Sequence, residues 1–351
     1  MIQKTKKYLL ATHRALSLTP KKFETLKKGY KNNWEAVWKQ VDGKQKKNID
    51  PDKIMQDLAE KNITYYILGE PDYPLALANI KSPPVILFCR GKNLEASDFP
   101  SISVVGSRKI SSYGKRALEE ITSEIARNNI TIISGLALGA DTLAHKIALA
   151  NNTHTVAVLG NGIDHIYPKF NQKWAEKALS ENKLTLLSEH WPGVHARPEF
   201  FPMRNRIVTG LSIATLIIEA AQKSGSLISA GMALDQNREV FAVPGEIFSP
   251  QSAGTNKLLA ETKAQAALSG TQILEMLGLQ KHQAAQKSLK QELPTTGLEA
   301  EVLKLFQDEP KQHINDLIRK SPLESHVTSA TLSLLEIKGW VKNLGNQEFS
   351  V

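Results

Sequence analysis

The stretch SISVVGSRKISSYGKRALEEITSEIARNNITIIS (101–134) decides the fold. It begins and ends with short runs rich in β-branched residues, at 101–105 and 130–134, and a helical run at 115–129 lies between them. Two apolar strands joined by a crossover helix predict parallel neighbours in a sheet that is covered on both faces.

The same alternation continues beyond this unit. A helical run at 141–152 follows, and four more candidate strands are HTVAVLG (154–160), KLTLLS (183–188), ATLIIEA (214–220) and REVFAVPG (238–245). We therefore expect an α/β domain over about 85–275, built on a parallel sheet. Ligands of such sheets bind beyond the carboxyl ends of the strands, so functional residues are expected in the loops that follow them.

Two smaller regions flank the predicted sheet. Residues 1–80 read as a small, mostly helical domain, with apolar residues three and four apart in 21–30 and 34–41. Residues 280–297 are rich in Gln and Lys and end in Pro-Thr-Thr-Gly, which indicates a linker. Three helical runs and a terminal hairpin predict a winged-helix domain over 298–351.

Positive charge is concentrated at the N-terminus. The 351 residues carry a formal net charge of +9, and residues 1–50 alone hold 13 Lys+Arg against 4 Asp+Glu. The remainder is net neutral, so charge indicates a polyanion partner only for the N-terminal segment, where solvated lysines are the plainer explanation.

Composition excludes several other classes of protein. The chain is 41% hydrophobic and 23% charged, as in globular domains, and no apolar run approaches the ~18–20 residues of a membrane span. Its single cysteine, Cys89, cannot form an internal disulfide, and no Cys/His cluster has zinc-ligand spacing. We expect a cytoplasmic protein without metal, cofactor or membrane contact.

The loop VVGSRKISSYGKR (104–116) connects a strand to a helix and suits an anion. Gly106 permits close approach of a ligand to the backbone, and Ser111 or Ser112 can cap the helix. Free N–H groups at a helix N-terminus attract phosphate, and Arg108 offers a bidentate clamp. A tight turn with a surface arginine explains the pattern equally well.

The next two loops carry weaker signals. In SGLALGADTLAH (134–145), Asp141 and His145 share a helix face, which a helix cap and a helical ion pair explain more simply than acid–base catalysis. LGNGIDHIYPKFN (159–171) resembles the start of a dinucleotide fingerprint, but His165 stands in place of the third glycine. A loop that presents backbone amides and Lys169 to phosphate fits as well.

Two later loops add to the same chemistry. FFPMRNRIVTGLS (200–212) places Arg204, Asn205 and Arg206 after two phenylalanines, a combination suited to single-stranded nucleic acid, although we expect at least one phenylalanine in the core. AQKSGSLISAGMAL (221–234) is another glycine-serine loop that opens a helix. Phosphate-binding residues thus follow at least four strands, without an activated nucleophile, a metal cluster or a Walker lysine.

Taken together, these loops resemble the DprA/Smf family over about 100–261. The matching blocks are SVVGSRKISSYG (103–114), SGLALGADTLAH (134–145), AVLGNGIDHIYPKFN (157–171), LSE (187–189), FFPMRNRIVTGLS (200–212), IIEAAQKSGSLISAGMAL (217–234), REVFAVPG (238–245) and AGTNKLLAE (253–261). The resemblance implies an extended Rossmann-type domain that binds single-stranded DNA in a basic pocket, flanked by a SAM-like or similar helical domain and a winged helix. It also implies a homodimer that loads RecA onto DNA during natural transformation, and no enzymatic activity.

The resemblance also implies the binding residues. DNA phosphates are expected at Gly106, Ser107 and Arg108, with secondary contacts at Gly160, Gly162, Lys169, Arg204, Asn205, Gly225 and Ser226. The family often has an arginine where this chain has Leu138, which removes one cation from the expected pocket.

Two enzymatic alternatives remain. Nucleotide phosphoribohydrolases share the fold but carry a P-G-G-x-G-T-x-x-E loop, and the corresponding loop QKSGSLISAG (222–231) has no acid. The second alternative, a dinucleotide-dependent redox protein, is supported only by the incomplete fingerprint at Gly160 and Gly162.

Overall fold

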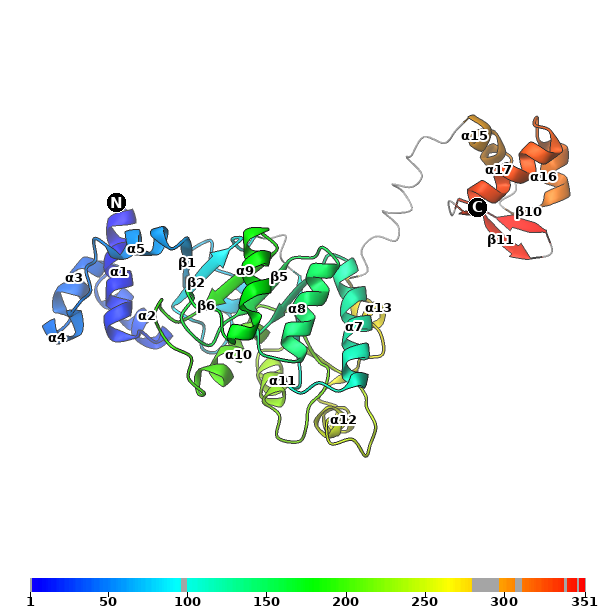
Figure 1. Cartoon of the computed structure of the whole chain (residues 1–351). Helices are drawn as coiled ribbons and strands as arrows, with labels where there is room; N and C mark the ends of the chain where they lie inside the picture. Colours follow the sequence, from blue (N-terminus) through cyan, green and yellow to red (C-terminus); the bar gives the residue numbers. More distant parts are fainter. Residues whose placement is uncertain are drawn as a thin grey trace. The chain divides into compact units, whose positions relative to one another are not determined.

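Figure 1 shows a computed structural model of the chain, which describes residues 2–95, 100–279, 297–306, 311–337, 340–345 and 347–350. The chain divides into two compact units, Met1–Gln280 and Lys281–Val351. Among the described residues, no helix combines the length and the apolar character needed to cross a membrane.

A nine-stranded sheet forms the centre of the first unit. Its strands run in the order β1-β2-β6-β5-β4-β3-β7-β8-β9. Their bounds are β1 (Ile63–Ile67), β2 (Ile86–Gly91), β3 (Ser101–Val105), β4 (Thr131–Ser134), β5 (Thr155–Val158), β6 (Leu184–Ser188), β7 (Ala214–Ile217), β8 (Glu239–Ala242) and β9 (Gln265–Ala266). The pairs from β6 to β9 are parallel, whereas β1 and β2 add an antiparallel edge. The six predicted strands and the α/β fold class are confirmed.

The strand order reverses at β3. From β3 the chain continues through β4, β5 and β6 on one side, then returns to β7 on the other side of β3. At such a reversal, the loops that leave neighbouring strands diverge to opposite faces and leave a crevice between them. The carboxyl ends of β3 and β7 are therefore the favoured place for a ligand.

Helices cover both faces of the sheet (Figure 1). Strand side chains alternate between the faces, so Ile102 and Val104 of β3 pack with α7 (Ser112–Arg127), α8 (Ala140–Ala150) and α13 (Gly270–Met276), while Val105 packs on the opposite face. The opposite face is covered by α6 (Leu75–Ala78), α10 (Phe200–Gly210) and α11 (Gly225–Asp235). β3 to β7 are buried throughout, as their near-continuous apolar sequence predicts.

The N-terminal helices pack on the edge of the sheet. They are α1 (Ile2–Leu16), α2 (Pro20–Gly29), α3 (Trp34–Gln40), α4 (Gly43–Lys46) and α5 (Ile54–Glu60). Phe23 stacks on Trp34 with ring centroids 5.3 Å apart, and their cluster continues into Phe88 of β2 and into α9 (Gln172–Ser180), which follows the short 3₁₀ helix η2 (Lys169–Asn171). β1 lies within the range expected to be mostly helical. A separate helical domain over 1–80 stays a prediction.

The second unit has the predicted three helices and hairpin. It contains α15 (Gly297–Lys304), β10 (Lys311–His313), α16 (Ile314–Lys320), α17 (Ser325–Ile337), β11 (Lys342–Gly345) and β12 (Glu348–Ser350). β12 lies between β10 and β11 in the sheet. The hydrophobic core of the unit contains Val302, Leu317, Leu332 and Phe349. Apart from Gly297, the predicted linker at 280–297 lies outside the described residues.

Candidate functional site

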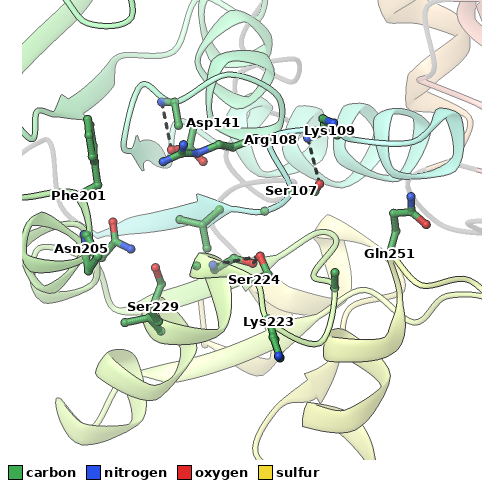
Figure 2. Close-up of a pocket in the computed structure, with 18 of the residues that line it drawn as sticks. Ser107, Arg108, Lys109, Asp141, Phe201, Asn205, Lys223, Ser224, Ser229 and Gln251 are labelled. Atoms are coloured by element: carbon green, nitrogen blue, oxygen red, sulfur yellow. Dashed lines mark hydrogen bonds between the residues drawn. The ribbon is translucent and has the colours of Figure 1, made fainter. Parts of the chain in front are cut away.

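A cavity of about 630 Å³ opens where the strand order reverses (Figure 2). Loops after β3, β4 and β7 form its walls, together with the first turns of α10 and α11 and the loop before α12 (Ala253–Ala260). The lining residues are Val105, Gly106, Ser107, Arg108, Lys109, Ala137, Asp141, Pro198, Phe201, Pro202, Arg204, Asn205, Ala221, Lys223, Ser224, Gly225, Ser226, Ile228, Ser229, Pro250 and Gln251.

The loop after β3 is held in place by two hydrogen bonds of Ser107. The Ser107 hydroxyl accepts the Lys109 N–H at 3.1 Å, and the Ser107 carbonyl accepts the Ala140 N–H at 3.1 Å. A Cβ atom at Gly106 would lie 2.9 Å from the Cβ of Ala140, so only glycine fits without displacing α8. The backbone is thereby fixed while the Arg108 and Lys109 side chains remain exposed.

Three exposed cations surround the cavity. Arg108 and Lys109 belong to the loop after β3, and Lys223 belongs to the loop after β7. The Arg108 guanidinium lies 5.7 Å from the Phe201 ring, which orients it by a cation–π contact. In the part of the chain that the structure describes, no ion pair engages any of the three. Their charge is available to an anion.

The N-terminus of α11 faces the same space. Ser224 caps this helix through the Ser226 N–H at 3.3 Å, and the two hydroxyl oxygens lie 2.7 Å apart. A Cβ atom at Gly225 would meet no heavy atom of another segment within 4 Å, so the backbone of the first turn is open to the cavity. The helix dipole and the unsatisfied N–H groups at such an end favour a phosphate.

The N-terminus of α7 is coupled to an internal carboxylate. Glu219, which is only 2% exposed, accepts the Ser111 N–H at 2.9 Å and the Ser111 hydroxyl. The hydroxyl of Ser111 in turn accepts the Gly114 N–H at 3.0 Å. An internal carboxylate therefore binds the N–H of the N-cap residue itself. The predicted cap at Ser111 is confirmed, and phosphate binding by this loop stays a prediction.

Arg204 lines the floor of the cavity but is almost completely buried. The residue is 3% exposed, and its guanidinium donates to the carbonyls of Gly135 and Val158, at the ends of β4 and β5. Burial lowers its pKa to about 10, so it remains charged at neutral pH. Arg204 thus ties two strand ends together and adds positive potential to the floor.

Asp141 accompanies this buried arginine. Its carboxylate accepts the N–H groups of Gly135 and Ala137 at 3.2 and 3.3 Å. Burial raises the pKa of Asp141, and the nearby Arg204 charge opposes that shift. It is the only carboxylate among the lining residues, and it is committed to the loop after β4.

His145 does not pair with Asp141. Its Nδ1 atom lies 2.7 Å from the Thr155 hydroxyl, and burial lowers its pKa to about 3. A neutral imidazole cannot form the predicted helical ion pair, which is therefore wrong. Nor do the two side chains form a solvent-facing acid–base pair, because both are buried.

The structure brings seven of the ten predicted phosphate-binding residues to the cavity. These are Gly106, Ser107, Arg108, Arg204, Asn205, Gly225 and Ser226. Gly160 instead packs against Phe201, and the Gly162 N–H donates to the Val194 carbonyl at 2.7 Å. The next helical residues after β5 begin only at Lys169, which is exposed, so the strand–turn–helix geometry of a dinucleotide fingerprint is absent there.

Several lining residues were not predicted as site residues. Lys109 follows Arg108 directly and Lys223 precedes the glycine-serine loop, so both had a local signal. Pro250 and Gln251 had none, since only the packing of the loop after β8 brings them to the cavity. Leu138 is 44% exposed and follows Ala137, which lines the cavity, in a loop held by Asp141.

Known proteins match most of this first unit. Residues 64–278 match the family described as DNA recombination-mediator protein A. The chain is 38% identical over 225 residues to the DNA processing protein DprA of Bacillus subtilis, an alignment that covers 64% of this chain and 75% of that protein.

Two solved structures are similar as well. DNA processing protein A of Streptococcus pneumoniae has a TM-score of 0.66 at 31% identity, covering 77% of this chain and 97% of that one. The structure of DNA processing protein A from Helicobacter pylori, which concerns its single-stranded DNA binding mode, has a TM-score of 0.55 at 30% identity and covers 63% of this chain and 99% of that one.

Proposed function

This chain belongs to the family of DNA recombination-mediator protein A, or DprA/Smf, and from that premise we propose that its cavity binds single-stranded DNA by the phosphates. The Helicobacter pylori relative, whose structure concerns its single-stranded DNA binding mode, supports the choice of ligand. The site residues and the binding mode argued below are part of the same proposal.

The observation that carries the proposal is the charge of the cavity. Arg108, Lys109 and Lys223 are exposed around it, whereas its one carboxylate, Asp141, is buried and hydrogen-bonded within the protein. Guanidinium and ammonium groups beside an open helix N-terminus are suited to phosphodiester oxygens. Such groups read the backbone and not the base edges, so binding is independent of sequence.

A titration of single-stranded and duplex oligonucleotides tests this proposal. The protein should prefer single strands, and affinity should fall steeply with salt. Arg108→Ala should weaken binding to all sequences equally and make the slope of log K against log[salt] shallower by about 0.7. Arg116→Ala is the matched control, because Arg116 is exposed on α7 outside the cavity. Preference for duplex, or equal affinities of the Arg108 variant and the unmodified protein, would overturn the assignment.

We further propose that the protein is a mediator and not an enzyme. Asp141, which lines the cavity, and Glu219, which follows β7, are buried and serve as acceptors for backbone N–H groups. Neither faces a ligand as the glutamate of a nucleotide phosphoribohydrolase would. Release of free base from a nucleoside monophosphate, lost in Glu219→Ala while binding of the nucleotide persists, would restore the enzymatic alternative.

The family further suggests what happens to the bound strand. We propose that the protein acts as a homodimer in the cytoplasm and loads RecA onto single-stranded DNA during natural transformation or recombination. The expected result is faster displacement of a single-strand-binding protein by RecA when this protein is present. A strictly monomeric protein at micromolar concentration that leaves that rate unchanged would contradict both parts.

A further inference from the structure

Two exposed aromatic side chains lie beyond the cavity wall formed by Phe201. The Phe201 ring contacts both the Arg108 guanidinium and the Tyr167 ring. The centroids of the two rings are 5.8 Å apart, with an interplanar angle of 34°. Tyr167 is 50% exposed, and Phe170, three residues further, is 77% exposed. Aromatic contact therefore continues from the cavity onto the adjoining surface.

The segment that carries these rings is firmly held from below. The Asn161 amide donates to the carbonyls of Gly162 and His165, at 2.9 and 2.7 Å. The fully buried Asn171 donates to the Leu136 carbonyl at 2.9 Å and to the Thr142 hydroxyl at 2.8 Å. The buried amide N–H groups of Asn161 and Asn171 thus fix the backbone of the segment, so the rings stay exposed on a defined surface instead of folding into the core.

The charge of this surface also suits a nucleic acid. Lys169 lies between Tyr167 and Phe170 in the sequence and is exposed, as is Lys173 one helical turn later. In the described part of the chain neither lysine forms an ion pair. Rings that offer a π-face to bases, with free ammonium groups for the backbone, are typical of surfaces that bind single strands.

We propose that single-stranded DNA leaves the cavity over Phe201 and continues across Tyr167 and Phe170, where bases stack, while Lys169 contacts a phosphate. The proposal rests on the binding function proposed above and names the direction in which the strand extends. It also gives Lys169, which does not line the cavity, a place along the bound strand.

The opposite rim is less suited to the strand. There the loop before Pro250 and Gln251 carries Ile247 and Phe248, which are 79% and 91% exposed. Figure 2 places Gln251 and Phe201 on opposite sides of the cavity. The exposed acid Glu246 precedes this apolar pair and would repel a phosphate.

A length series of poly-dT oligonucleotides tests the direction. The Kd of the shortest oligonucleotide whose binding depends on Arg108 measures binding in the cavity alone. The Kd of longer oligonucleotides also includes contacts with the surface at Tyr167 and Phe170. Phe170→Ala should leave the Kd of the short oligonucleotide unchanged and raise that of the long one about fivefold or more, since each stacked base contributes to affinity. Phe170→Trp should retain the affinity and Phe170→Leu should lose it, because the ring and not its hydrophobicity is required.

Salt dependence separates the lysine from the ring. Lys169→Ala should make the salt slope for the long oligonucleotide shallower by about 0.7, whereas Phe170→Ala should leave the slope unchanged. Phe248→Ala is the matched aromatic control. A 2-aminopurine base placed outside the cavity should lose fluorescence on binding, and this quenching should be reduced in Phe170→Ala.

The outcomes distinguish this inference from the function on which it rests. If Phe170→Ala binds both lengths like the unmodified protein, or if Phe248→Ala alone weakens the long one, the strand does not follow Tyr167 and Phe170. If Arg108→Ala has no effect on either length, the cavity assignment fails instead.

Discussion

Leu138 illustrates how much one residue contributes at the edge of a charged cavity. It is exposed beside Ala137, in a loop whose backbone Asp141 fixes, at the position where the family often has an arginine. Since the loop is held by hydrogen bonds to its backbone, the identity of the side chain at 138 is free to vary without loss of the fold.

Leu138→Arg should strengthen binding of single-stranded DNA. A guanidinium at this exposed position adds a charge-assisted contact, so the Kd should fall about fivefold at low salt and the salt slope should steepen. Leu75→Arg, at another exposed leucine outside the cavity, is the control. Equal gains in both variants would show a general charge effect and not a local contact.

His13 makes stability depend on pH. It belongs to the last turn of α1, is buried and accepts the Trp191 indole N–H at 3.0 Å. Burial lowers its pKa from 6.5 to about 4. The unfolded chain therefore binds more protons between these values. The stabilisation is fully present above pH 6.5 and is lost as the pH falls towards 4.

The free energy of unfolding should accordingly decrease by about 2 to 3 kcal/mol from His13 alone between pH 7 and 4.5. Urea unfolding followed by tryptophan fluorescence measures it. His13→Gln keeps an acceptor for Trp191 but does not titrate, so its decline should be smaller by that amount. His195→Gln, at an exposed histidine, should behave like the unmodified protein. The prediction is contradicted if the free energy of unfolding of the unmodified protein decreases no more than that of His13→Gln.

At the scale of elements, two helices begin close to the cavity and are used differently. The N-terminus of α7 binds the internal carboxylate of Glu219, which couples the helix to the end of β7. The N-terminus of α11 is capped only by the hydroxyl of its own Ser224 and stays open to the cavity. One end therefore holds the fold together, and the other faces the cavity, where we propose that it binds a phosphate.

Gly225→Asp should separate binding from folding. The new side chain meets no other segment, and an acid in the first turn of a helix is favourable, so the free energy of unfolding should change by less than about 1 kcal/mol. DNA affinity should nevertheless fall at least tenfold, because the carboxylate repels phosphate and occupies the helix N-terminus.

Gly231→Asp provides the matched control on the same helix. This glycine also has free space around its Cβ position but does not line the cavity. Filter binding at fixed salt, with thermal unfolding of both variants, measures the effect. Comparable losses of affinity at the two positions would place the DNA elsewhere on the protein.

For the whole molecule, charge favours the first unit over the second as the main binding site. Residues 295–351 contain six Lys+Arg and eight Asp+Glu. Winged helices that enter a DNA groove rely on phosphate neutralisation and usually carry surplus positive charge. The second unit is better suited to an accessory role or to contact with a protein.

A chain that ends at residue 280 should keep most of its affinity for single-stranded DNA. Residues up to this point form a compact unit with its own sheet and core, so the shortened chain is expected to fold. Circular dichroism checks the fold and a titration at two salt concentrations measures the binding. Loss of most affinity in a folded fragment would make the second unit the principal site.

The sequence by itself predicted the strands β3 to β8 and the helices between them, but not β1, β2 or β9. Apolar β-branched runs and three- to four-residue periodicity are local signals of backbone state, and β3 to β8 appear where those signals lie. Glycine, serine and arginine after a strand likewise indicated phosphate chemistry at Gly106, Arg108 and Gly225 before any spatial arrangement was known.

Only the tertiary structure decided which of these loops meet. β3 and β7 are neighbours although more than 100 residues separate them, and their pairing brings Arg108 and Lys223 to one cavity. The tertiary structure also buries polar groups together with their hydrogen-bond partners. The Glu219 carboxylate accepts the Ser111 N–H, and the Arg204 guanidinium donates to carbonyls at the ends of β4 and β5. Spacing along the chain cannot reveal such partners. A buried polar group without a hydrogen bond destabilises the fold, and the groups that pair with it here are distant in the sequence.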